Sequence, residues 1–188
     1  MKRNRYYVYI SHARKDGGRA AVFLRRRIEN FRIPERLVER EYLPEDPDFV
    51  GPVFCDLRGR ESSEYLAGEE VLEALASSRY LLVICSPAAV RSLWVHKEIE
   101  YFLASHDNDF SKIVPVILEG RPGSGGEDEC LPPLLRTPAI TSRNLPTMLP
   151  DEGESREEGW ENGFVQVLCR MLHLDRQKIA AALADKHL

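Results

Sequence analysis

Two glutamates and a tryptophan lie within one short segment, SLWVHKEIEYF at 92–102, whose apolar residues recur at helical spacing. A helix turns about 100° per residue, so with Val95 facing the core, Glu98 lies about 60° and Trp94 about 100° from it on the same edge. Glu100 lies about 140° from Val95, toward water. Glu98, one turn after an indole, is therefore the candidate site residue of this segment.

A purely structural interpretation of the same pair is also open. Trp94 would complete the core, and Glu98 would form a surface ion pair, because a Trp and a Glu four residues apart are common on amphipathic helices. The functional interpretation is that Glu98 is a site residue beside the indole of Trp94.

The bulk composition limits the classes of partner. The chain has 188 residues, 43% hydrophobic and 30% charged, which fits one globular domain with some peripheral structure. A net charge of -4 argues against nucleic acid and against an anionic membrane as the main partner. The apolar run at 6–10 is too short for a secretory signal, and no run approaches a membrane span. We therefore expect a cytoplasmic protein.

The cysteines and histidines give no metal or nucleophile motif. Cys55, Cys85, Cys130 and Cys169 are far apart, with no Cys-x-x-Cys pair, which predicts reduced thiols and no structural zinc. The sequence has no His-Glu-x-x-His spacing, no Gly-x-Ser-x-Gly elbow and no Walker loop. We therefore expect no metal site.

Apolar runs alternate with amphipathic segments along the chain. Strands are expected at 6–10, 52–56, 80–85 and 112–118, with a fifth near 138–141. Helices are expected from Arg19 to Pro34, at 69–78, 86–105 and 160–172, and from Asp175 to His187, and residues 34–52 read as a loop. Pro115 points to an edge position for the fourth strand.

This alternation predicts an α/β fold, a flavodoxin-like open parallel sheet with helices on both faces, plus C-terminal helices. The commonest strand order for such a sheet is 2-1-3-4-5. Ligands of open parallel sheets bind beyond the carboxyl ends of the strands, where the strand order reverses. Segments 11–16 and 86–94 would wall that crevice, and the loop at 56–68 would fold over it.

At this point the residues resemble a known family. YYVYISHARKD, the long segment from VFCDLRGRESSEYLAGEE to SPAAVRSLWVHKEI, and KIVPVILEG together resemble a TIR (Toll/interleukin-1 receptor) domain in its bacterial form, over roughly residues 5–145. His12 stands where the family has a tyrosine, Cys55-Asp56 matches its Arg-Asp loop, and Ala67-Gly68 matches its Pro-Gly. Ser62-Ser63 lengthen the same loop. The implied organisation is a TIR domain at 1–145 and, at 146–188, a C-terminal loop and helical extension packed on or linked to it.

The resemblance implies an activity. Many TIR domains cleave NAD+ at the nicotinamide–ribose bond, with the catalytic glutamate in a Trp-x-x-x-Glu pattern, here Trp94 to Glu98. Glu98 is then the catalytic residue and NAD+ the substrate, with no cofactor. The implied substrate-binding residues are Trp94, Ser11, His12, Arg14, Asp56 and Ser86.

Alternatives remain for several of these residues. Asp56 is equally a turn residue, Ser86 an N-cap, and His12 and Arg14 solvated loop residues. At the level of function, the resemblance implies activation by self-association in bacterial defence or signalling, with a sensor domain or protein outside this chain as a further partner. The competing interpretation is a non-catalytic adaptor that acts through TIR–TIR contacts.

Overall fold

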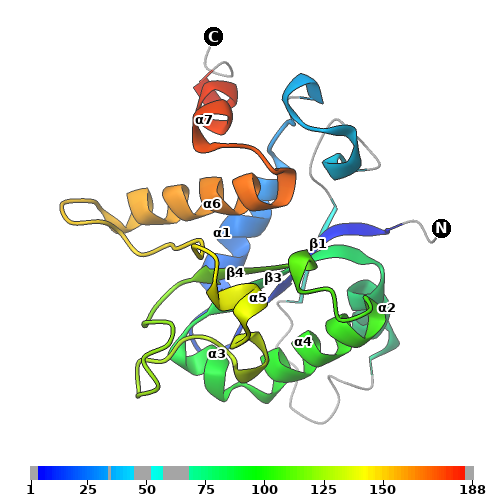
Figure 1. The fold of residues 1–188 in the computed structure, drawn as a ribbon, viewed down its shortest axis with the longest axis vertical. Coiled ribbons are helices and arrows are strands. Elements are labelled where there is room, and N and C mark those ends of the chain that lie inside the picture. Colours follow the sequence, from blue (N-terminus) through cyan, green and yellow to red (C-terminus); the bar gives the residue numbers. More distant parts are fainter. Residues whose placement is uncertain (1–3, 34, 45–51, 57–67, 185–188) are drawn as a thin grey trace.

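Four parallel strands form the sheet at the centre of the molecule (Figure 1). The computed structural model describes residues 4–33, 35–44, 52–56 and 68–184. The strands are β1 (Tyr6–Ser11), β2 (Val53–Cys55), β3 (Ser78–Cys85) and β4 (Ile113–Ile117), in the order β2-β1-β3-β4. The predicted α/β, flavodoxin-like fold class is confirmed, with the first four predicted strands in the predicted order.

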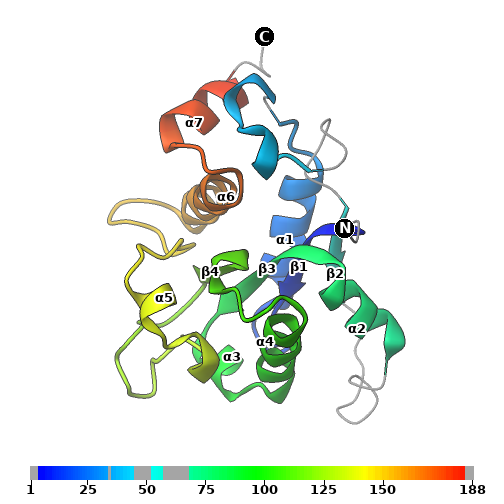
Figure 2. The same cartoon turned by 45° about the vertical axis from the view of Figure 1, so that its right-hand side comes forward.

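Helices cover both faces of the sheet (Figure 2). One face carries α1 (Gly18–Glu29) and α6 (Arg156–Leu172), with α7 (Arg176–Ala184) against α6. The other carries α2 (Glu69–Ala76), α3 (Pro87–Arg91) and α4 (Leu93–Ser105). Two separate hydrophobic clusters result, and β3 between them is buried at seven of its eight positions, which explains the apolar run at 80–85.

Pro115 sits inside β4 without breaking it. Along a strand, successive main-chain N–H groups point to alternate sides. The N–H of Ile117 points away from β3, since it donates to the Pro146 carbonyl at 2.9 Å. Pro115, two residues earlier, therefore has its missing N–H on the same outer side, where the described sheet has its edge.

The predicted helix over 86–105 is wrong in one respect, because Ser92 divides it into α3 and α4. Ser92 has an extended backbone (ψ 116°), and its hydroxyl accepts the Val95 N–H at 3.3 Å as the N-cap of α4. The break gives α4 its own axis and an N-terminus at Leu93, one residue before Trp94.

The predicted fifth strand near 138–141 is wrong. Residues Pro138–Thr141 form the short helix α5, opened by Pro138 at its first position. The place beside β4 is taken further along the chain, where Thr147 forms an isolated parallel bridge with Ile117. A single bridge carries little of the alternating apolar pattern by which a strand is predicted.

Several of the described connections contain short helical turns. Two 3-10 helices, η1 (Glu35–Leu37) and η2 (Arg40–Tyr42), occur where an irregular loop was expected, and η4 (Phe110–Lys112) and η5 (Pro133–Leu135) flank later elements. The expectations for Ser62-Ser63 and Ala67, and for the end of the last helix at His187, fall outside the described residues. Among the described residues, no helix combines the length and apolar character needed to cross a bilayer.

Helix α6 approaches the chain at 147–150 closely through two glycines one turn apart. A Cβ at Gly163 would lie 2.6 Å from Met148 Cγ and 2.9 Å from the Thr147 carbonyl oxygen. A Cβ at Gly159 would lie 2.7 Å from the carbonyl oxygen of Met148. The absence of side chains lets the segment that bridges β4 lie directly on α6.

We predict that Gly163→Ala lowers the free energy of unfolding by about 1–3 kcal/mol, although alanine is the better helix former, because the added methyl group overpacks the contact. Chemical denaturation measures this. Gly18→Ala in α1, where a Cβ would meet no atom within 4 Å, is the matched control and should be neutral or stabilising. Equal effects of the two substitutions would contradict the close-packing account.

Candidate active site

Glu98 is a buried carboxylate at the carboxyl end of the central strand. Only 2% of the residue is exposed. The Tyr9 hydroxyl donates to Oε2, and the Ser11 hydroxyl donates to Oε1 at 3.1 Å. Tyr9 and Ser11 are two residues apart on β1, so both side chains leave the strand on the face that α4 covers. Each oxygen of the carboxylate is thus fixed by one hydroxyl donor.

A small cavity lies at this point, with a volume of about 20 Å³. Six residues line it: Ile10, His12, Arg14, Asp56, Trp94 and Glu98. They come from the ends of β1 and β2 and from α4, so the structure brings the candidate glutamate and four of the six candidate binding residues to one place. The volume holds about one water molecule, so a larger ligand requires lining side chains to move.

Two of the lining residues, Arg14 and Trp94, lie toward solvent. Arg14 is exposed and Trp94 is half-buried. Trp94 is one helical turn before Glu98 on α4, as the helical geometry predicted. The site is therefore polar and fixed on its inner side, and it has an indole and a guanidinium on its outer side.

His12 joins the ends of two strands. Its Nε2 lies 3.3 Å from the Asp56 carbonyl oxygen, and its Nδ1 lies 3.2 Å from the Ala13 carbonyl oxygen. The contact between Nε2 and the Asp56 carbonyl oxygen connects the loop after β1 to the end of β2. This contact brings Asp56 to the cavity next to His12.

Two further candidates lie away from the cavity lining. Ser11 is fully buried behind it and acts on Glu98. Ser86 is also fully buried, and its hydroxyl accepts the Ala89 N–H at 3.1 Å, which caps α3. The N-cap expected for Ser86 is present, and its contact with substrate stays a prediction.

The second glutamate of the segment is on the solvent side of α4, as expected. The Glu100 side chain is 58% exposed, with Oε2 3.5 Å from His96 Nε2. Glu98 differs from the expectation of a border position, because β1 covers it. Its burial follows from Tyr9 and Ser11, which a helical projection of α4 alone does not contain.

Nucleophilic thiol chemistry has no support beside the cavity. Burial, the largest effect, raises the pKa of the Cys55 thiol to about 12, so this thiol is protonated at neutral pH. All four cysteines are free. Within the described ranges, no group of three His, Cys, Asp or Glu side chains could hold a metal ion.

A flavodoxin-like parallel sheet with a buried acid beyond its strand ends defines the class. The chain belongs to the TIR domain family, whose profile matches residues 8–147. A relative named NAD(+) hydrolase ApTIR, from Actinoplanes sp., is 30% identical over 116 residues. That match covers 62% of this chain and 14% of the relative, so this chain spans a small part of that protein's length.

A solved structure with a similar chain is that of the TIR domains in the activated Roq1 resistosome, described as directly recognising the pathogen effector XopQ. The similarity has a TM-score of 0.43 and 17% sequence identity, and it covers 97% of this chain and 99% of that chain.

Tyr9 is the site residue that sequence reasoning missed. Its ring stacks on Phe54 (5.1 Å between centroids, 18° between planes), and its hydroxyl reaches Glu98. The available signal was strand alternation: Tyr9 precedes the candidate Ser11 by two residues, so the two share a face.

We predict that Tyr9→Phe lowers the free energy of unfolding by about 2 kcal/mol, because the substitution removes a hydrogen bond to a buried carboxylate. Urea denaturation measures the loss. Tyr6→Phe on the same strand is the matched control, since Tyr6 contacts Phe54 through its ring edge (5.3 Å, 71°) and keeps that contact. A loss of the same size in both variants would contradict the hydrogen-bond account.

Proposed function

We propose that this chain cleaves NAD+ at the nicotinamide–ribose bond, and that self-association activates it in bacterial immune defence or signalling. The observation that carries the proposal is the buried Glu98 carboxylate, fixed by two hydroxyl donors at a cavity which Trp94 also lines. Membership of the TIR family and the relative named as an NAD(+) hydrolase support it.

One carboxylate is enough for this reaction. Ordinary glycoside cleavage uses two carboxyl groups, one of which protonates the leaving oxygen. Nicotinamide in NAD+ is already cationic, so when the C1′–N bond breaks, the electron pair neutralises the ring and no proton is required. Positive charge develops on the ribose instead, and a carboxylate that accepts hydrogen bonds from the ribose hydroxyls stabilises it.

A carboxylate oxygen can accept more than one hydrogen bond, so a hydroxyl donor from the protein does not exclude one from the ribose. A carboxylate offers about four lone-pair sites. Tyr9 and Ser11 each donate to one oxygen of Glu98. The ribosyl cation is then captured either by water, which loses a proton and gives ADP-ribose, or by a nucleophilic group of the same molecule, which gives a cyclic product.

The outer residues of the cavity have chemistry that suits the rest of the substrate. The Trp94 indole offers a face on which an aromatic ring can stack. The exposed Arg14 guanidinium can pair with a pyrophosphate oxygen. NAD+ is the substrate in this scheme and no cofactor is required. The cytoplasm, which contains NAD+, is the compartment we propose.

A non-catalytic adaptor is the second candidate, and the cavity volume favours it. A space of about 20 Å³ does not admit nicotinamide riboside. In an adaptor, Glu98 would fix the end of β1 against α4 and would have no substrate. In the enzyme, association with a second TIR domain would open the outer wall at Arg14 and Trp94.

We predict that Glu98→Gln reduces nicotinamide release from NAD+ by at least about a hundredfold, because the amide keeps the shape of the side chain and loses the charge. Release is measured at high protein concentration, with circular dichroism as a check on folding. Glu100→Gln, on the same helix and exposed, is the control and should retain full activity. Release by Glu98→Gln equal to that by the wild type would contradict the catalytic role of Glu98, and no release by the wild type at high concentration would leave only the adaptor.

We also predict that activity per molecule rises with protein concentration, since a state formed by association is populated by mass action. Leu93, at the start of α4 beside Trp94, is 57% exposed and is the apolar side chain that we assign to this contact. Leu93→Asp should remove the concentration dependence and the activity. Leu149→Asp, at a 41% exposed leucine distant in sequence from α4, is the control. Concentration-independent activity would contradict activation by association.

A further inference from the structure

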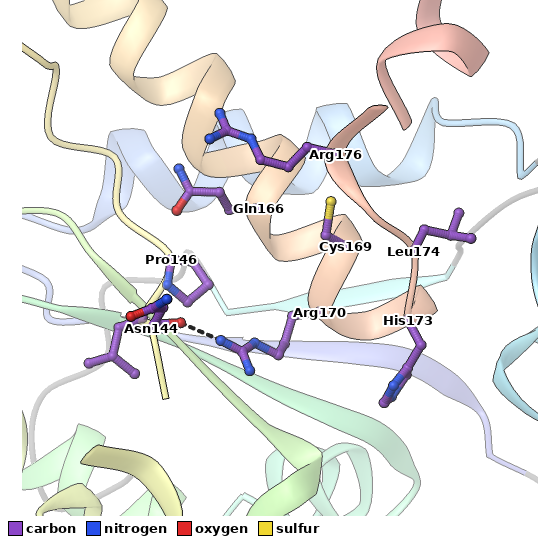
Figure 3. Close-up of a pocket in the computed structure, with 9 residues that line it drawn as sticks. Asn144, Pro146, Gln166, Cys169, Arg170, His173, Leu174 and Arg176 are labelled. Atoms are coloured by element: carbon purple, nitrogen blue, oxygen red, sulfur yellow. Dashed lines mark hydrogen bonds between the residues drawn. The ribbon is translucent and has the colours of Figure 1, made fainter. Parts of the chain in front are cut away.

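A second and much larger cavity lies at the edge of the sheet, between the chain at 144–146 and the C-terminal helices (Figure 3). Its volume is about 530 Å³. One wall is the second half of α6 with the start of α7, and the other is the segment that crosses from α5 to the bridge at Thr147. The volume is in the range of about 300–1,000 Å³ typical of small-molecule sites.

Both walls are held in place by side-chain contacts. The Tyr80 hydroxyl on β3 donates to the Met171 carbonyl at 3.0 Å, which fixes the last turn of α6 to the sheet. The Gln166 amide accepts the Thr147 N–H at 3.1 Å, and the Arg170 guanidinium donates to the Asn144 carbonyl oxygen (Figure 3). The groove is therefore preformed, which lowers the ordering cost of binding.

The lining is cationic although the chain as a whole has a net charge of -4. Arg170 and Arg176 contribute guanidinium groups, and none of the nine residues that line the groove is acidic. Burial, opposed by the nearby glutamates Glu41 and Glu39 and reinforced by Arg170, holds the pKa of His173 below its usual range. At neutral pH the positive charge of the lining therefore comes from the two arginines.

The two guanidinium groups come from separate elements and differ in how they are engaged. Arg170, on α6, uses part of its donor set on the Asn144 carbonyl oxygen. Arg176, at the start of α7, is exposed and takes part in none of the ion pairs or hydrogen bonds found in the described part of the chain. Its side chain extends along α6 toward Gln166 (Figure 3). Arg176 is thus available to an incoming anion at no cost in existing contacts.

We propose that this groove binds an organic phosphate of mononucleotide size, with Arg176 and Arg170 on the phosphate and the apolar side chains of Leu145 and Pro146 against the remainder of the molecule. A phosphate presents oxygens in several directions and can accept from two guanidinium groups on different helices. A carboxylate, with two oxygens in one plane, satisfies one such fork. This site is separate from the Glu98 cavity and does not depend on the proposed activity.

Isothermal titration calorimetry of the full chain with adenosine 5′-monophosphate, adenosine and inorganic phosphate tests the proposal. We expect saturable binding of the monophosphate, competition by inorganic phosphate, and binding of adenosine weaker by at least about tenfold, because a charge-assisted hydrogen bond is lost. Arg176→Gln should weaken monophosphate binding by about tenfold or more, and Arg170→Lys should weaken it in the same direction.

Two controls locate the site. Arg26→Gln, at an exposed arginine on α1, should bind the monophosphate as the wild type does. Glu98→Gln should also bind it unchanged, which separates the groove from the candidate active site. Equal affinity for adenosine and its monophosphate, wild-type affinity in Arg176→Gln, or a dissociation constant above about 1 mM for the monophosphate would overturn the proposal.

Discussion

The molecule depends on one constraint, the burial of a carboxylate where α4 crosses the end of β1. A buried charge is costly unless hydrogen bonds replace its water, and here two hydroxyl groups of β1 do so. Tyr9 and Ser11 must therefore stay in register with Glu98. The two hydrogen bonds that offset the cost of burying the Glu98 carboxylate also fix the orientation of both its oxygens. The carboxylate is therefore already oriented to stabilise a positive charge.

Other elements of the fold hold Tyr9, Ser11 and Glu98 in position. Phe54 on β2 stacks on Tyr9 and fixes its ring, and Ser92 separates α4 from α3 so that α4 begins one residue before Trp94. On the opposite face of the sheet, α6 shares the hydrophobic cluster of β1 and closes the second groove. The two cavities thus have separate linings and different chemistry, one at the strand ends beside α4 and the other at the sheet edge beside α6.

Much of this was predictable from the sequence, and the failures have physical causes. The alternation of strands and helices predicted the sheet, and helical geometry separated Glu98 from Glu100. The burial of Glu98 was not predictable in the same way, because it depends on the register between α4 and β1, which no local pattern contains. The bridge at Thr147 was missed since one bridge leaves no periodic signal, and the large groove was missed because its walls are distant in sequence.

The most direct measurement for the central claim is a crystal structure of the wild-type chain with a non-cleavable NAD+ analogue. The account predicts a Glu98 oxygen within hydrogen-bonding distance, about 2.5–3.0 Å, of a ribose hydroxyl, with the nicotinamide beside Trp94 and the hydroxyls of Tyr9 and Ser11 still on the carboxylate. An analogue bound elsewhere, with Glu98 in contact only with Tyr9 and Ser11, would contradict it.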